Sequence, residues 1–260
     1  LSCDKYIKLA EHMIVTYQNL WADNPFVFRI PYNKNYPISL KEKFGSQKIE
    51  EIQTKKSIKE TVLALINDLD DDEWIYWCMD DHYPIEMNLK EINKIIDMIL
   101  NKKIKNHNFS SISFCKTENL SLSSKGVILT NNSQPFLERK DYKGIWMHQF
   151  LKVKVLRYLF NNFPDNNFNA KEMDHFKKEL KIPQDQVFLV SKRSMMVLGE
   201  STYRGKLTRN CMERFQNQNL ELPANFKLAS NQYIVRGRFF YNWLNLNLGN
   251  KLRSILKINN

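Results

Sequence analysis

The chain has 260 residues, 43% hydrophobic and 12% aromatic, which is enough to bury a sizeable core. Lysine and arginine (39) exceed aspartate and glutamate (28), and the net charge of +11 favours polyanions or an anionic membrane surface. No apolar run is long enough to span a bilayer, and the four cysteines are too scattered for a zinc finger or a dense disulfide framework. We expect a cytoplasmic protein that can associate peripherally with a membrane.

Helical and extended patterns alternate along the first half of the chain. Apolar side chains recur at helical spacing over residues 6–20, 56–69 and 89–100, and apolar runs of strand type occupy 26–30 and 74–79. This order predicts an α/β fold with a mostly parallel central sheet flanked by helices. Ahead of the first helix, the apolar run expected of a first strand is missing or cut short.

The second half of the chain has a less regular pattern, which predicts an irregular α+β part. Strands are expected at 112–115, 126–129, 143–147, 187–190 and 195–198, and helices at 148–161, 172–180 and before 216. Residues 236–256 are aromatic and basic at both ends, as in a helix packed on the core or an amphipathic membrane-surface element. We expect one α/β domain over 1–220, with residues 221–260 as a helical, aromatic extension packed on it.

The most informative motif follows the predicted strand at 74–79. The apolar run ends at Asp80, Asp81 and His82, and Pro84 is expected to stop any continuation. Ligands of α/β sheets bind beyond the carboxyl ends of strands, so a metal-bound diphosphate is expected here, with a plain solvated turn as the alternative. The acidic run at 70–72 lies at the entry of the strand and is interpreted as a solvated loop.

Three segments in this order resemble small GT-A-fold glycosyltransferases: residues 2–6 ahead of a helix, 74–83, and 144–151. The resemblance extends over 2–215 and implies a GT-A-like, Rossmann-like sheet. It also implies a nucleotide-sugar donor, most simply a UDP-sugar, commonly used with a divalent cation. We expect the acceptor to be a glycan or a lipid-linked molecule, as in surface polysaccharide synthesis.

The resemblance also implies roles for individual side chains. Asp80 would face the ribose or the donor sugar, while Asp81 with His82 would hold Mn²⁺ or Mg²⁺. His82 stands where a strict Asp-x-Asp motif has a carboxylate, and metal dependence stays open because imidazole suits Mg²⁺ poorly. Three N-terminal side chains are expected near the nucleotide base: Cys3, Asp4 and Tyr6.

Other polar side chains are candidates for the chemistry of transfer. An inverting reaction needs a carboxylate to take the proton of the acceptor hydroxyl, and Glu172 or Asp174 is the candidate base. Both acids could instead complement a helix dipole. Arg204 and Lys206 precede a predicted helix and would bind phosphate, or form a plain basic turn. His148 is interpreted as a packed histidine.

Glycosyl transfer is therefore the expected function, with two alternatives. The first is a non-catalytic basic module that binds nucleic acid or an acidic glycan on a degenerate version of the same fold. Nucleic acid is the less expected partner, because the sequence has no zinc finger, no aromatic RNA-binding consensus and no block of five basic residues. The second is a metal-dependent phosphoryl-transfer enzyme or nuclease that uses Asp80 and Asp81.

Overall fold

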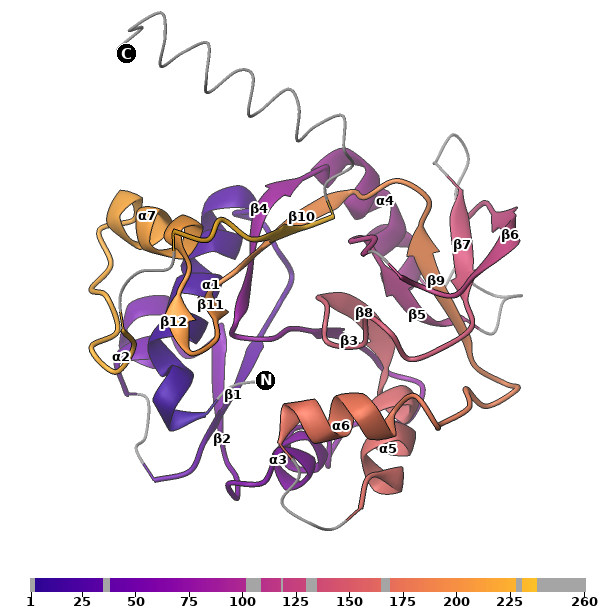
Figure 1. Cartoon of the computed structure of the whole chain (residues 1–260), viewed down its shortest axis with the longest axis horizontal. Helices are drawn as coiled ribbons and strands as arrows, with labels where there is room; N and C mark the ends of the chain where they lie inside the picture. Colours follow the sequence, from indigo (N-terminus) through magenta and orange to yellow (C-terminus); the bar gives the residue numbers. More distant parts are fainter. Residues whose placement is uncertain are drawn as a thin grey trace, which may run out of the picture.

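The largest sheet of the computed structural model has six strands in the order β3-β8-β5-β9-β7-β6 (Figure 1). The structure describes residues 3–34, 38–101, 109–117, 119–129, 135–164, 169–227 and 231–237. In the order of the sheet, the six strands are β3 (Trp74–Trp77), β8 (Gln149–Lys152), β5 (Phe109–Ser113), β9 (Val187–Ser191), β7 (Phe136–Arg139) and β6 (Leu122–Val127).

Three smaller groups of strands accompany this sheet. A parallel pair consists of β1 (Phe28–Tyr32) and β2 (Ile49–Gln53). A three-stranded sheet contains β13 (Val235–Arg236), β10 (Met196–Glu200) and β4 (His82–Met87), in that order. A short hairpin is formed by β11 (Thr202–Tyr203) and β12 (Lys206–Leu207).

Seven helices and one 3₁₀ turn of the described residues pack around these sheets. They are the 3₁₀ turn η1 (Asp4–Tyr6), α1 (Ile7–Leu20), α2 (Ile38–Phe44), α3 (Ile58–Leu65), α4 (Leu89–Leu100), α5 (Val153–Asn162), α6 (Ala170–Phe176) and α7 (Arg209–Asn217). Neighbouring residues of a strand point to opposite faces, so Phe150 joins the core that contains α1 and α4, and Leu151 the core that contains α3 and α5. The predicted α/β class with a helix-flanked sheet is confirmed.

The helix predicted at 89–100 has those limits in the structure. The side chain of Asn88 accepts a hydrogen bond from the backbone N–H of Glu91 and caps the first turn. The apolar positions Ile92, Ile95 and Ile99 are buried along one face. Both signals are local, which is why the sequence pattern is sufficient here.

The expectation of a mostly parallel sheet is wrong. Of the five neighbouring pairs in the six-stranded sheet, β5–β9 is parallel and the other four are antiparallel. Strand–helix alternation predicts parallel pairing, but it holds only for the first half of the chain. In the second half, as far as the structure describes it, β5 to β8 follow one another without an intervening helix, and the consecutive strands β6 and β7 pair antiparallel. The other three antiparallel pairs join strands that are not consecutive in the chain.

The boundaries expected at 143–161 also differ. The strand predicted at 143–147 is a turn that contains Gly144 at φ +76, a left-handed conformation that a strand does not use. The side-chain amide of Gln149 donates to the carbonyls of Gly144, Ile145 and Met147 and holds this turn. Strand β8 therefore begins at Gln149, and α5 begins after it instead of at residue 148.

Pro84 does not stop the strand pattern as expected. The chain turns between β3 and β4 and continues through Pro84 as β4, in a different sheet. The pairing of β4 with β10 has a register shift beside Pro84, where Leu198 pairs with Pro84 and Val197 with Glu86. A proline is tolerated there because β4 is an edge strand with a bulge next to the proline.

The end of the chain is described only up to residue 237. Residues 231–237 include β13, which pairs with β10, so this part of the predicted C-terminal extension is a strand of a sheet rather than a helix. The predicted aromatic helix falls almost entirely outside the described residues. In the described part of the chain, no helix combines the length and hydropathy that a membrane span requires.

His12 is a buried histidine that should make the fold sensitive to acid. Its ring stacks on Phe215 with centroids 4.3 Å apart and meets the edge of Tyr83 at 4.6 Å. Burial, with a further contribution from the charge of Arg214, lowers the pKa of His12 to about 3. An unfolded histidine titrates near about 6.5, so below this pH the unfolded chain binds a proton that the folded chain does not. As the pH is lowered from about 6.5 to 3, the free energy of unfolding should therefore fall by about 1.4 kcal/mol per pH unit.

We expect the substitution His12→Phe to remove this contribution, because phenylalanine keeps the stacked ring without the ionisable nitrogens. Between about pH 7.5 and about pH 5, urea unfolding of the wild-type chain should show a loss about 2 kcal/mol larger than that of the variant. His175→Gln, at an exposed position, is the control and should keep the wild-type dependence. Equal pH dependence in wild type and His12→Phe would contradict the prediction.

Candidate functional site

The candidate site is built around the turn between β3 and β4, residues 78–81. The backbone N–H of His82 donates to the carbonyl of Met79 at 3.2 Å and closes the turn. Asp80 and Asp81 therefore sit at the carboxyl end of β3, where the sequence places them. Asp80 is buried, whereas the side chain of Asp81 is 45% exposed.

Asp81 and His82 form an ion pair, with Oδ1 and Nδ1 2.8 Å apart. Burial alone would lower the pKa of His82, but the Asp81 carboxylate outweighs burial and the pKa is raised. Partial burial would likewise raise the pKa of Asp81, and the charge of His82 outweighs this effect and lowers it. Both shifts favour a carboxylate paired with an imidazolium.

Two residues that the sequence pattern does not single out complete this part of the site. Glu200 pairs with His82 across β10 and β4, and its charge also raises the pKa of His82. Arg236 donates to Glu200 at 2.6 Å from the neighbouring β13. Only the pairing of β4, β10 and β13, which are far apart in sequence, brings these charges together, so no local pattern could have identified them.

The N-terminal residues meet the same turn. Burial, followed by the nearby Asp80 carboxylate, raises the pKa of the Tyr6 hydroxyl, and the same two causes raise the pKa of the Cys3 thiol. Asp4 instead accepts hydrogen bonds from the backbone N–H groups of Asn33 (2.7 Å) and Lys34 (2.9 Å), just after β1. The Asp80 carboxylate therefore acts electrostatically on Cys3 and Tyr6, while Asp4 joins the N-terminal turn to the carboxyl end of β1.

The basic pair predicted at residues 204–206 lies in the β11–β12 hairpin. Arg204 (φ +49) and Gly205 (φ +74) form its tip, and left-handed angles at both central residues are those of a type I′ turn. The backbone N–H of Ser201 donates to the carbonyl of Asp81 at 2.6 Å, which fixes the base of the hairpin beside the β3–β4 turn. Thr208 caps helix α7, so its first turn is already satisfied within the chain.

Both candidate bases have structural contacts. Glu172 belongs to a capping box at the start of α6, in which its carboxylate accepts from the backbone N–H of Asn169. Asp174 accepts a hydrogen bond from Trp146 Nε1 at 2.6 Å and forms an ion pair with Lys177. Trp146 belongs to the acceptor-side segment 144–151, so Asp174 rather than Glu172 is connected to that segment.

His148 lies against the turn between β3 and β4 and contacts its backbone. Its Nδ1 lies 2.7 Å from the hydroxyl of Tyr17 and its Nε2 2.9 Å from the carbonyl of Met79. Burial, followed by the charge of His82, lowers its pKa to about 3, which favours a neutral ring. The interpretation of His148 as a packed histidine agrees with these contacts.

A divalent cation would need several oxygen or nitrogen ligands at one point. Among the described residues, no three His, Cys, Asp or Glu side chains come together as ligands of one ion. Asp81 and His82 instead form an ion pair with each other, with Oδ1 and Nδ1 2.8 Å apart. This arrangement does not fit a preformed metal site, so the metal role of Asp81 and His82 stays a prediction and the proposed reaction uses no cation.

Similarity to known proteins is confined to solved structures. No family model matches the chain, and no curated protein matches its sequence. Among solved structures, the chain is similar to 2-C-methyl-D-erythritol 4-phosphate cytidylyltransferase of Francisella tularensis, with a TM-score of 0.38 and 16% sequence identity. The alignment covers 82% of this chain and 92% of that chain. A likeness this distant carries no conclusion about substrate or activity.

Proposed function

We propose that the chain is a glycosyltransferase that moves a sugar from a nucleoside-diphosphate donor to a glycan or lipid-linked acceptor. The observation that supports this proposal is the convergence of four features at the carboxyl ends of β1 and β3. They are the Asp81–His82 ion pair, the buried Asp80, the N-terminal Cys3 and Tyr6, and the base of the β11–β12 hairpin. Sites of α/β folds are found at such strand ends.

In the proposed donor site, one group of side chains would bind the nucleoside and another would bind the diphosphate. Tyr6, whose hydroxyl lies within the electrostatic influence of Asp80, would lie against the base or ribose of the nucleotide. Arg204 at the tip of the hairpin and Lys206 at the start of β12 would contact the diphosphate, together with the His82 side chain that pairs with Asp81. These positive groups would stabilise the negative charge that develops on the leaving diphosphate.

In the proposed reaction, the bond between the anomeric carbon and the diphosphate oxygen breaks, and its electron pair leaves with the diphosphate. The acceptor hydroxyl oxygen forms the new bond to the anomeric carbon. A carboxylate takes the hydroxyl proton. Asp174 is the better candidate of the two acids, because Trp146 links it to the acceptor-side segment while Glu172 caps a helix.

A thermal-shift panel of UDP, GDP and CDP, with and without Mn²⁺, tests the donor site. A diphosphate at about 100 times its Kd should stabilise the chain by about 2.7 kcal/mol, which raises the melting temperature by about 5–10 °C. The variant Asp81→Asn should lose this shift. Asp72→Asn is the matched control, because Asp72 is an exposed carboxylate paired with Lys152 and Lys154 at the opposite end of β3.

A folded Asp81→Asn variant with an unchanged shift would contradict the assignment of the donor site. Titration with single-stranded RNA at two salt concentrations separates the competing hypothesis of a nucleic-acid-binding module. A protein that neutralises six to ten phosphates loses about 10³–10⁵-fold in affinity between about 50 and 200 mM salt. Steep loss of RNA binding, with no nucleotide shift in the panel, would favour that module over the glycosyltransferase.

A further inference from the structure

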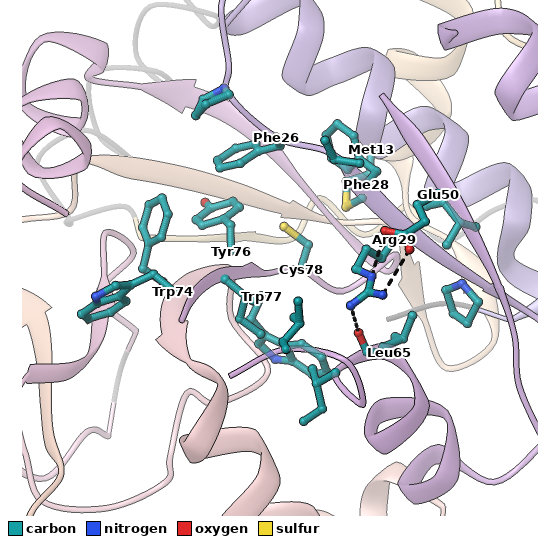
Figure 2. A pocket seen from close by; sticks show the side chains of 18 of the residues that line it. Met13, Phe26, Phe28, Arg29, Glu50, Leu65, Trp74, Tyr76, Trp77 and Cys78 are labelled. Carbon is teal, nitrogen blue, oxygen red and sulfur yellow. Dashed lines mark hydrogen bonds and ion pairs between the residues drawn. The ribbon is translucent and has the colours of Figure 1, made fainter. Parts of the chain in front are cut away.

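Two cavities of the structure differ in what their arginine side chains contact. The larger, of about 410 Å³, lies between β1 and β3 and is mostly apolar (Figure 2). Its arginine, Arg29, is bound to the carbonyl of Leu65 and to the carboxylates of Glu50 and Asp68. The smaller, of about 230 Å³, is lined mainly by α7 and β4, and its arginine is Arg214. In the part of the chain that the structure describes, the guanidinium of Arg214 forms no ion pair and no hydrogen bond.

The smaller cavity lies against a polar stripe of α7. The stripe consists of Asn210, Glu213, Arg214 and Asn217, whose spacing of three and four residues places them on one face of the helix. This spacing carries apolar residues where a helix packs against a core. In α7 the apolar contacts are made by a neighbouring face that includes Phe215. The helix therefore presents polar groups to the cavity.

Arg214 carries the uncompensated charge of this cavity. Glu213 also lines it, but its carboxylate accepts a hydrogen bond from Nε of Arg209 at 2.8 Å. Adjacent residues of a helix do not face each other, so Glu213 is not the partner of Arg214. The side chain of Arg214 is half-buried, and a charge that is partly removed from water is stabilised by an opposite charge.

Unsatisfied hydrogen-bond donors line the same cavity. Tyr83 is 1% exposed, and its hydroxyl oxygen accepts a hydrogen bond from Nδ2 of Asn210 at 2.6 Å. The orientation of this amide is fixed, because its Oδ1 accepts from the backbone N–H of Ile234 at 3.0 Å. The hydroxyl proton of Tyr83 has no acceptor among the described residues, and a buried donor without an acceptor costs free energy. The hydroxyl of Tyr233 and the side-chain amide of Asn217 also have no hydrogen-bond partner in the described ranges.

We propose that this cavity binds a small organic carboxylate, paired with Arg214 and hydrogen-bonded by Tyr233 and Asn217. A guanidinium holds the two oxygens of a carboxylate in a bidentate pair, and the neutral donors complete the coordination of the anion. The volume is below the range of about 300–1,000 Å³ that is usual for drug-sized ligands, so the ligand is small. The proposal is independent of the glycosyltransferase assignment.

The charges and walls of the cavity favour a carboxylate over a phosphate. One uncompensated guanidinium balances a monoanion, whereas a phosphate dianion would also face the carboxylate of Glu213. The side chain of Ile85 and the ring of Tyr83 line the cavity and give the organic part of the ligand apolar contacts.

A carboxylate in this cavity would also join α7 to the segment 231–237. Asn210 of α7 already binds this segment, through the N–H of Ile234 at 3.0 Å and its carbonyl at 3.3 Å. Tyr233 precedes Ile234, so an anion that contacts both Arg214 and Tyr233 adds a second connection across the same junction. Binding should therefore slow amide hydrogen exchange within residues 232–236.

Calorimetric titration with sodium propionate, at neutral pH and at an ionic strength kept constant with sodium chloride, tests the proposal. We expect a Kd of about 1 mM, an affinity that the few non-hydrogen atoms of propionate can supply. Arg214→Met keeps the unbranched stem without the guanidinium and should weaken binding at least about tenfold, and Tyr233→Phe should weaken it about threefold or more. Arg193→Met, which removes the same charge from an exposed turn between β9 and β10, is the matched control and should keep the wild-type Kd.

No binding of propionate up to about 50 mM, which is about 50 times the expected Kd, would overturn the proposal. Equal binding by wild type and Arg214→Met would overturn it as well. If Arg214→Met does not fold, Arg214→Lys replaces it, because lysine keeps the charge without the bidentate fork and should still weaken binding. Sodium phosphate is the second ligand, and tighter binding of phosphate than of propionate would contradict the assignment to a carboxylate. Unchanged exchange within residues 232–236 at saturating propionate would contradict the proposed contact with Tyr233.

Discussion

Replacing Gly199 by alanine should destabilise the chain by about 1–3 kcal/mol, as expected for overpacking in a well-packed core. A Cβ at this position would lie 2.5 Å from Cζ of Tyr83 and 2.7 Å from its hydroxyl oxygen. Tyr83 cannot move aside easily, because it is 1% exposed and its hydroxyl accepts a hydrogen bond from Asn210 at 2.6 Å. The loss should appear as a lower midpoint in urea at neutral pH.

Gly126→Ala is the matched control for this prediction. Gly126 also lies in a strand with φ outside the left-handed region, but it is exposed, and the nearest atom to a Cβ there would be Cβ of Pro135 at 3.1 Å. Because β6 is an edge strand that can shift slightly, we expect this variant to stay within about 0.5 kcal/mol of wild type. A Gly199→Ala variant as stable as Gly126→Ala would show that β10 packs on Tyr83 more loosely than these distances indicate. The position of Glu200 in the candidate site would then be less firmly fixed as well, because Glu200 follows Gly199 in β10.

The largest expected effect on activity is that of Asp174→Asn, which should lower turnover by about 10²–10⁴-fold with little change in donor binding. The amide keeps the size of the side chain and can still accept from Trp146, but it cannot take a proton from the acceptor. Glu172→Gln should stay close to wild type, since glutamine preserves the capping box. Single-turnover transfer from a UDP-sugar measures both variants.

Three outcomes of this comparison are informative. Loss of turnover in Asp174→Asn alone supports Asp174 as the base, and loss in Glu172→Gln alone would transfer the role to Glu172. Near-normal turnover in both variants would contradict an inverting mechanism that uses either acid. Lys177→Met controls for the ion pair of Asp174, because it removes the pairing charge and keeps the carboxylate.

The parts of the fold that depend on local signals are predictable from the sequence. Helix α4 has its cap at Asn88 and its apolar stripe within a dozen residues, and its limits coincide with the prediction. The position of Asp80 and Asp81 after an apolar strand is equally local. Strand β4 is missed because Pro84 suggests a stop, and only its pairing with β10 shows that the chain continues.

The remainder of the candidate site depends on pairing between distant strands. Glu200 and Arg236 reach His82 because β4, β10 and β13 form one sheet, which no spacing in the sequence reveals. The ion pair between Asp81 and His82 also depends on how the two side chains are oriented, which their adjacency in the sequence does not determine. The mostly antiparallel pairing of the large sheet depends in the same way on contacts between segments far apart in the chain.

Hydrogen exchange in the presence of UDP tests the donor site most directly. If the nucleotide binds at the carboxyl ends of β1 and β3, amide exchange should slow within residues 3–6 and 80–82 and at the β11–β12 hairpin, and exchange in β6 and β7 at the far edge of the sheet should not change. The same experiment with Asp81→Asn should show no protection. Binding of UDP with protection elsewhere would contradict the proposed function. The absence of UDP binding up to about 1 mM, the upper end of typical KM values, would contradict it as well.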